Sequence, residues 1–232
     1  NKHLTLLVHS MGGLVSRWFI EREGGHQVVD HLVMCGTPNN GSLETFRSLQ
    51  EGVTVPGIGH VSAATVFTMP AAYQLLPHDE ETVFLDAQGR PLEVSLYDPA
   101  NWPRYGWSIF NPFIQTAHGA PQQRFLALAL ARAQRFHRAL DAGNPAEDPV
   151  EYVLLGSDCQ PTLQRAVLEP QGPRWRTRFT MEHPTLNRAL FGFGDGSVTK
   201  DSLIGSHHIG IDRDALALST LHVAYAVFVC ET

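Results

Sequence analysis

The sequence predicts an α/β fold built on a parallel β-sheet. Residues 4–9 form a short apolar run that leads into a serine and two glycines, which is typical of a strand that turns sharply into a helix. A second apolar run at 28–35 follows the predicted helix. A strand, a helix and a second strand in such a short stretch indicate a crossover connection, so the two strands are expected to be parallel. Further apolar runs at 150–156 and 221–230 are expected to be buried core strands of the same fold.

Ser10 stands at the predicted turn between the first strand and the first helix, within Val8-His-Ser-Met-Gly-Gly13. A serine at the tip of such a turn presents its hydroxyl at the sheet edge, while the next backbone N–H, that of Met11, points to where an oxyanion would form. The two glycines suit close packing of the helix against the strand. Val8 departs from the pattern, because a glycine is usual at that place. The run predicts a serine nucleophile.

The repeat of Leu14, Val15, Trp18 and Phe19 predicts an apolar face on the first helix, which is expected to stop at residues 24–25, where two glycines follow. Later in the chain, residues 174–181 are expected to form one arm of a hairpin, with residues 171–173 as its turn.

Residues 43–149 are predicted to form a large insertion within a single domain that spans residues 1–232. This stretch lacks the alternation of strands and helices, and it is rich in proline, glycine and aromatic residues. A long insertion between core strands usually forms a cap or lid over a site, although a substructure that only packs is the alternative. Within it, the pattern predicts a turn at 86–90 and an amphipathic helix over 122–142 with a solvated arginine face.

Charge and spacing argue against several classes of function. The formal net charge is -6 and the sequence has no basic block, which argues against a nucleic-acid partner. No segment approaches the roughly 18 apolar residues that span a bilayer, so only peripheral membrane contact is left open. The histidines and cysteines lack metal-ligand spacing and no glycine-rich phosphate loop follows a strand, so neither a metal nor a cofactor is expected.

Three cysteines, an odd count, favour buried thiols over a disulfide framework: Cys35, Cys159 and Cys230. The oligomeric state and the compartment stay open, with the cytoplasm slightly favoured.

In this order, the motifs resemble those of the α/β-hydrolase superfamily, and within it the branch of lecithin:cholesterol acyltransferase-like and lipase-like hydrolases. The resemblance is carried by Val8 to Gly13, Gly36-Thr-Pro-Asn-Asn-Gly-Ser42, Met69-Pro-Ala-Ala-Tyr-Gln-Leu-Leu-Pro77, Gly156 to Thr162 and Gly194-Asp-Gly-Ser-Val198. It implies an incomplete α/β-hydrolase fold that starts at the nucleophile strand, and a Ser, Asp, His triad in that chain order.

The resemblance implies Ser10 as the nucleophile and Asp195 as the acid that orients the histidine. Asp158 is the alternative acid, because it follows a core strand directly, and Asp201 ranks third. In the family's order the catalytic histidine follows the last strand, so we expect it just beyond Thr232.

Other histidines are alternatives for the base, and each also has a structural interpretation. His207 and His208 precede the last strand and are expected to be loop or surface residues. His222 opens that strand, at the wrong end for the site. His9 is expected in the core or beside the turn, and His137 on the helix surface.

These residues predict a serine hydrolase of carboxylic esters, lipase-like or esterase-like, with acyl transfer to an alcohol also open. The second oxyanion donor is expected from a loop before Asn1, so residues 1–232 alone are expected to be nearly inactive. The aromatic-rich insertion favours a lipid or other apolar acyl ester as substrate. The alternatives are a non-catalytic module of the same fold that binds a lipid or a protein, and cleavage of amides by the same triad.

Overall fold

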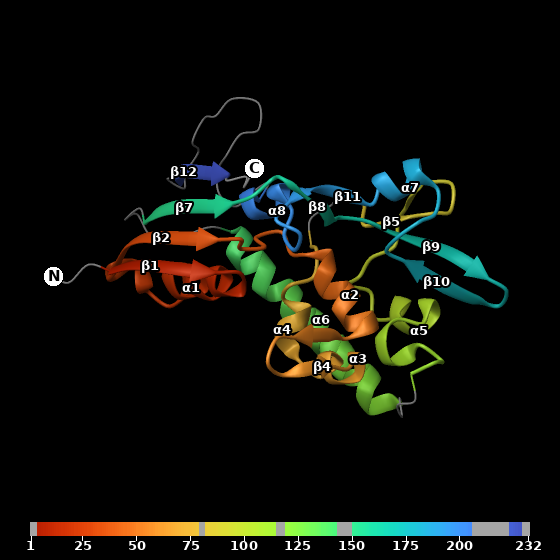
Figure 1. The fold of residues 1–232 in the computed structure, drawn as a ribbon. Helices are drawn as coiled ribbons and strands as arrows, with labels where there is room; N and C mark the ends of the chain where they lie inside the picture. The colour runs from red at the N-terminus through yellow and green to blue at the C-terminus, as the bar shows by residue number, and fades with distance from the viewer. Residues whose placement is uncertain (1–3, 79–81, 115–118, 143–149, 206–222, 229–232) are drawn as a thin grey trace. The chain divides into compact units, whose positions relative to one another are not determined.

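A computed structural model of the chain describes residues 4–78, 82–114, 119–142, 150–205 and the strand at 223–228 (Figure 1). The chain forms two compact units, which are described separately below. The first, here called the sheet unit, consists of Asn1–Gly41, Phe136–Thr162 and Gly192–Thr232. The second, here called the aromatic unit, consists of Ser42–Arg135 and Leu163–Phe191.

The sheet unit contains a four-stranded sheet in the order β1-β2-β7-β12, and every neighbouring pair is parallel. Its strands are β1 Leu4–His9, β2 Val29–Cys35, β7 Glu151–Gly156 and β12 Val223–Phe228. In the central register, Met34 of β2 pairs with Val8 on one side and with Leu154 on the other. The predicted parallel sheet, with its helical crossover after the first strand, is therefore confirmed.

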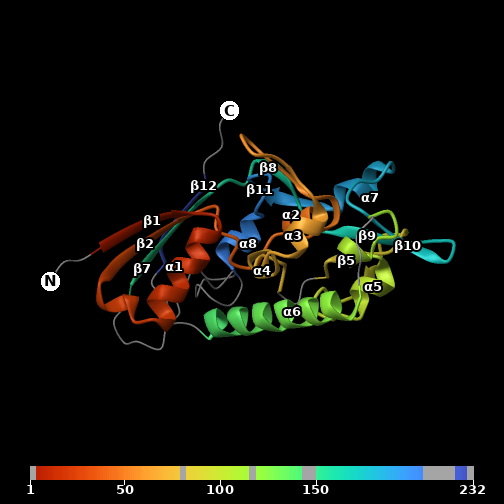
Figure 2. The ribbon, with the colours of Figure 1, turned by 90° about the horizontal axis from the view of Figure 1, so that it is seen from below.

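Helix α1 Met11–Arg22 lies along one face of this sheet (Figure 2). It ends where the two glycines follow, since Gly24 has a φ of 78° that favours glycine. The short 3-10 turn η1 Gly25–Gln27 then leads into β2.

The buried face of α1 differs from the predicted one. Val15 is 58% exposed and Phe19 is 41% exposed, whereas Leu14, Arg17 and Glu21 are buried. The apolar repeat misplaced this face because Arg17 and Glu21 pair with each other inside the unit, as described below. Two charged residues thus occupy part of the stripe that an apolar pattern would assign to the core.

The rest of the sheet unit comes from the second half of the chain. The strands β8 Gln160–Leu163 and β11 Phe191–Gly194 form a two-stranded sheet, and helix α8 Lys200–Ile204 follows β11. The C-terminal part of the long helix α6 Ala120–Asp141 also belongs to this unit.

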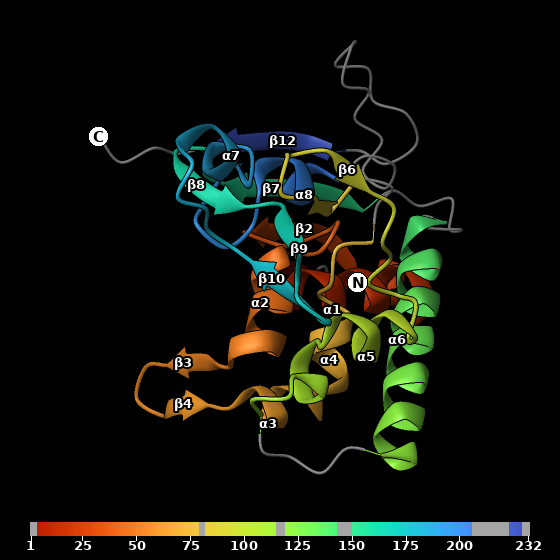
Figure 3. The ribbon, with the colours of Figure 1, turned by 90° about the vertical axis from the view of Figure 1, so that its right-hand side faces the viewer.

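The aromatic unit combines short helices with a four-stranded sheet in the order β10-β9-β5-β6 and with a separate β3–β4 hairpin, which Figure 3 shows. Its helices are α2 Leu43–Glu51, α3 Ala63–Phe67, α4 Pro70–Tyr73, α5 Asn101–Tyr105, η2 Ser108–Phe110 and α7 Pro184–Arg188. Its strands are β3 Val53–Val55, β4 Gly59–Val61, β5 Phe84–Leu85, β6 Pro91–Leu92, β9 Ala166–Gln171 and β10 Arg174–Arg178. The predicted turn at 86–90 and the predicted hairpin around 171–173 are both present.

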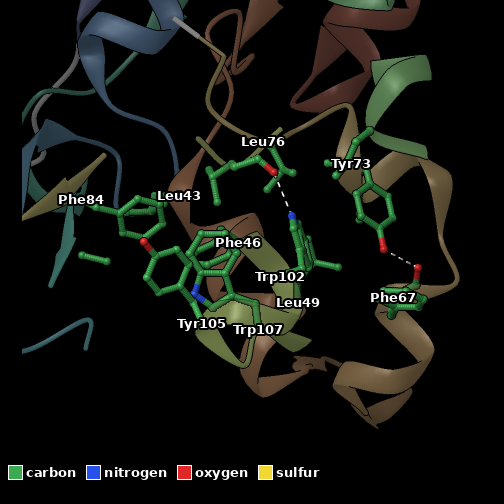
Figure 4. Close-up of a cluster of buried hydrophobic side chains, with 14 of the residues drawn as sticks. Leu43, Phe46, Leu49, Phe67, Tyr73, Leu76, Phe84, Trp102, Tyr105 and Trp107 are labelled. Carbon is green, nitrogen blue, oxygen red and sulfur yellow. Dashed lines mark hydrogen bonds between the residues drawn. The ribbon is translucent and has the colours of Figure 1, made fainter. Parts of the chain in front are cut away.

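The core of the aromatic unit is a cluster of rings around Phe46 (Figure 4). The Phe46 ring centroid lies 5.0 Å from that of Trp107 and 6.2 Å from that of Trp102, both in edge contacts. The polar tips are satisfied: Trp102 Nε1 donates to Leu96 O at 2.9 Å, and the Tyr73 hydroxyl donates to a backbone oxygen. The aromatic residues of this unit therefore mainly fill its own core, and their number does not by itself argue for an apolar substrate.

Helix α6 confirms the predicted amphipathic helix, with Ala133 and Leu140 buried and the arginines Arg132 and Arg135 exposed. The expected surface position of His137 is wrong, because its side chain is only 3% exposed. His137 lies four residues after Ala133 and three before Leu140, and this spacing places it on the buried stripe.

Candidate active site

Ser10 lies at the junction of β1 and α1, between the last strand residue His9 and the first helical residue Met11. Its backbone has φ 53° and ψ −129°, a conformation that residues other than glycine rarely adopt. Its N–H donates to Cys35 O at 2.8 Å, which ties the turn to the end of β2. The side chain is half-buried and does not cap α1. His9 is exposed, so the expected core position of this residue is wrong.

The start of α1 packs against the loop that follows β2. A Cβ atom at Gly13 would lie 2.1 Å from Thr37 Oγ1 and 2.5 Å from its Cγ2, so only glycine fits there. A Cβ atom at Gly12 would lie 3.6 Å from Val8 Cβ, which is an ordinary contact. Val8 therefore causes no steric conflict at the turn, although it departs from the usual pattern.

The loop after β2 is held from both sides. Gly36 has a φ of 55° and its N–H donates to Leu155 O at 2.9 Å, at the end of β7. Asn39 is buried, and its Nδ2 donates to Leu203 O at 2.7 Å. Thr37 between them is fully buried. No role for Thr37 or Asn39 followed from the sequence, because a polar loop residue carries no local sign that it is buried.

A buried polar network connects α1 to that loop. Arg17 Nε donates to Glu21 Oε1 at 2.9 Å, and Arg17 Nη1 donates to Asn39 Oδ1 at 3.0 Å. Arg17 Nη2 also donates to Leu140 O at 3.2 Å, and the Tyr152 hydroxyl donates to Glu21 Oε1 at 3.3 Å. Burial raises the pKa of Tyr152 well above its ordinary value, and the neighbouring Glu21 carboxylate adds to this, so the hydroxyl stays a donor. The network fixes the loop beside Ser10 through charged groups.

Asp195 lies in a tight turn between β11 and α8. Its Oδ1 accepts the backbone N–H groups of Ser197 at 2.8 Å and Val198 at 2.7 Å. Thr162 Oγ1 accepts the N–H of Gly196 at 2.8 Å, which anchors the turn to β8. One carboxylate oxygen of Asp195 is thus fixed by the backbone, while within the described residues no hydrogen bond reaches Oδ2.

The turn with Asp195 lies at the same sheet edge as Ser10. A Cβ atom at Gly36 would lie 3.0 Å from Asp195 Oδ2, so this carboxylate lies over the end of β2. Ser10 lies at the end of β1, and β1 and β2 are adjacent and parallel (Figure 1). The carboxyl edge of an open parallel sheet is where ligands usually bind. A hydroxyl and an oriented carboxylate at this edge could serve nucleophilic catalysis if a base joined them.

The other candidate acids lie in different surroundings. Asp158 follows β7, and its Oδ2 accepts from Lys200 Nζ at 2.7 Å. Asp201 is exposed in the first turn of α8. In the part of the chain that the structure describes, no histidine contacts Asp195. His207, His208 and His222 lie outside the described residues.

The cysteines differ from the expectation of buried thiols. Cys159 is disulfide-bonded and its partner lies outside the described residues, whereas Cys35 is a half-buried free thiol. An odd number of cysteines leaves room for one bridge and one free thiol, which sequence counting did not weigh.

The described residues contain no group of three or more His, Cys, Asp or Glu side chains that could hold a metal ion. The helices within these ranges include none that is long and apolar enough to cross a membrane.

Comparisons with known proteins identify the relatives of this chain. The model of the family "Lecithin:cholesterol acyltransferase" matches residues 1–129. No curated protein matches the sequence. Among solved structures, the crystal structure of the Tle4–Tli4 complex contains a chain that is similar in fold, with a TM-score of 0.57 and 18% sequence identity. The match covers 88% of this chain and 50% of that one, so the chain spans about half the length of this neighbour. The predicted α/β-hydrolase fold class is confirmed.

Proposed function

The chain belongs to the lecithin:cholesterol acyltransferase family, and from this premise we propose that the protein is a serine hydrolase of carboxylic esters. Membership supports ester hydrolysis or acyl transfer as the kind of activity. The finer assignment is our proposal: Ser10 is the nucleophile, Asp195 is the acid, and the backbone N–H of Met11 is an oxyanion donor.

The backbone of Ser10 is the observation that carries the proposal. A serine before a helix normally adopts extended backbone angles, and its side chain caps the helix. Ser10 instead has φ 53°, and its hydroxyl makes no capping bond. Such strain costs on the order of 1–3 kcal/mol and persists where the surroundings impose it, often at functional sites. Here the bond from Ser10 N–H to Cys35 O and the contact of Gly13 with Thr37 impose it.

The acid and the oxyanion donor are supported by hydrogen bonding. Two backbone N–H groups orient Asp195 through Oδ1, which leaves Oδ2 to accept an imidazole N–H. The carboxylate of Asp158 is already paired with Lys200, which makes it the weaker candidate. Met11 is the first residue of α1, so its N–H has no acceptor within the helix and is available to an oxyanion.

In the proposed reaction, Ser10 Oγ attacks the ester carbonyl carbon while a base takes the hydroxyl proton. The C–O bond to the alcohol then breaks, the base returns the proton to the leaving alcohol, and an acyl-serine remains. Water or an acceptor alcohol attacks this ester and releases Ser10. We assign the base to a histidine that completes the Ser, Asp, His triad; His207 and His208, which lie outside the described residues, are candidates in this sequence. Lipid or other acyl esters are the proposed substrates, because the family is named for acyl transfer from a lipid.

Labelling with a fluorophosphonate on the full-length protein tests the nucleophile. We expect one covalent adduct on the peptide that contains Ser10, and none after Ser10→Ala. Ser16→Ala, which changes a serine on the helix that follows Ser10, is the matched control and should label like the wild type. Hydrolysis of p-nitrophenyl esters with short and long acyl chains then reports the substrate class. No labelling, or labelling that survives Ser10→Ala, would overturn the proposal in favour of a non-catalytic binding module.

A further inference from the structure

A second feature that could bind a ligand lies within the aromatic unit and shares no residue with the candidate active site. A cavity of about 690 Å³ is bounded by the end of α2, the segment around α5 and η2, and the β9–β10 hairpin. Figure 1 shows α5 beside β10. Three arginines line the cavity: Arg104, Arg174 and Arg176. Its volume is in the range of sites for small organic molecules.

The charge of this cavity is opposite in sign to that of the chain. The formal net charge of the chain is -6, but three arginines line the cavity. Among the described residues, Glu51 provides the only carboxylate that lines it. Glu51 Oε2 accepts from Arg47 Nε at 2.9 Å, so its charge is already compensated. Within the described ranges no carboxylate lies within ion-pair distance of the three cavity arginines. The cavity therefore holds an excess of positive charge.

Aromatic rings accompany these arginines. Arg104 Cζ lies 5.3 Å from the Tyr105 ring centroid, and Arg174 Cζ lies 5.8 Å from that of Phe113. Phe113 is 81% exposed, and Trp175, whose ring packs edge-on against Tyr105 at 5.2 Å, is 36% exposed. Exposed rings among cations suit a ligand that has both an anionic group and an apolar part.

We propose that this cavity binds the phosphate group of an anionic amphiphile, with the exposed rings in contact with the apolar part. Arginine is suited to phosphate because its planar fork offers several donors to the oxygens. Three guanidinium groups on two segments match the oxygens of a phosphate better than the two oxygens of a carboxylate. A phospholipid headgroup and a soluble phosphate ester share this chemistry, and the experiment below separates them. The proposal does not rest on the proposed hydrolase activity, because its readout is binding.

The test measures binding to two ligands with full-length protein that carries Ser10→Ala, so that no lipid is consumed. The ligands are phosphatidylcholine vesicles with or without phosphatidylglycerol, measured by sedimentation, and glycerol phosphate, measured by calorimetry. The triple variant R104Q/R174Q/R176Q removes the cavity charges. The control R124Q/R132Q/R135Q removes three exposed arginines of α6 that do not line the cavity. Thermal unfolding verifies that both variants fold, and R176Q alone repeats the test if the triple variant does not.

We expect the cavity variant to lose affinity for vesicles with phosphatidylglycerol by on the order of 100-fold, and the control by less than about threefold. Phe113→Ser should weaken vesicle binding but leave glycerol phosphate binding unchanged. Binding of glycerol phosphate alone, lost in the cavity variant, would support the site with a soluble ester as its ligand. The proposal is overturned if neither ligand binds, or if the cavity and control variants lose affinity equally.

Discussion

The sheet unit and the aromatic unit bury different chemistry. Beside its apolar core, the sheet unit buries Arg17, Glu21, Thr37 and Asn39, and these groups bond to one another or pack around the loop beside Ser10. The aromatic unit is held by rings whose N–H and O–H groups bond to nearby groups, and Arg104, Arg174 and Arg176, which pair with no carboxylate among the described residues, line its cavity. The difference teaches that buried polar groups here serve to position loops, whereas ring packing serves stability.

The largest expected effect is on catalysis in the sheet unit. Asp195→Asn should lower kcat by about 10⁴-fold, because the amide cannot hold the proposed histidine in the productive tautomer. Asp158→Asn weakens the partly exposed pair with Lys200 and should lower kcat by less than about tenfold. Ester hydrolysis by the full-length variants, with thermal unfolding to verify folding, is the measurement. A larger loss of kcat in Asp158→Asn than in Asp195→Asn would indicate that Asp158 is the catalytic acid.

In the aromatic unit, Phe46→Ala should lower the free energy of unfolding by about 4 kcal/mol. Phe46 is fully buried and touches the rings of Phe84, Trp107 and Phe179, so its removal leaves a cavity. Phe113→Ala, at an exposed ring, should change it by less than about 0.5 kcal/mol. Denaturant unfolding measures both. Equal losses would mean that the ring cluster is not the core.

In the sheet unit, Arg17→Met should cost about 3 kcal/mol of unfolding free energy, because Glu21 would remain buried without its cation. The double variant R17M/E21M should recover part of this loss. We also expect Arg17→Met to lower kcat, since Asn39 loses the bond that holds its loop. A loss below about 1 kcal/mol with kcat unchanged would show that the buried charges do not position the loop.

The smallest expected effect compares two neighbouring glycines. Gly13→Ala should cost about 2 kcal/mol, because its Cβ would overlap the buried side chain of Thr37. Gly12→Ala should be neutral or slightly stabilising, since its Cβ meets Val8 at an ordinary contact distance and alanine favours helix. Adding Thr37→Ala to Gly13→Ala should restore part of the loss. Denaturant unfolding of the wild type, the two single glycine variants and the double variant measures these free energies. Equal losses of unfolding free energy in Gly12→Ala and Gly13→Ala would contradict the expected overlap.

Features that depend on local pattern were predictable from the sequence, and features that depend on distant partners were not. The strand ending before Ser10, the helix stop at Gly24 and the long helix α6 follow from apolar periodicity and glycine geometry. The prediction of the buried face of α1 was wrong because Arg17 has hydrogen-bond partners that lie 22 and 123 residues away in the chain. The catalytic roles of Ser10 and Asp195 stay predictions, although their places in the fold are now described.

By itself, the sequence determined the α/β class, the parallel crossover and the position of Ser10 between a strand and a helix, since periodicity and turn residues act over short distances. Only the tertiary structure decided that Asp195 lies over Gly36, that Thr37 packs against Gly13, and that Arg104 and Arg174 line one cavity. These pairs are far apart in the chain. Their contacts depend on how whole elements pack, and no local pattern specifies that packing.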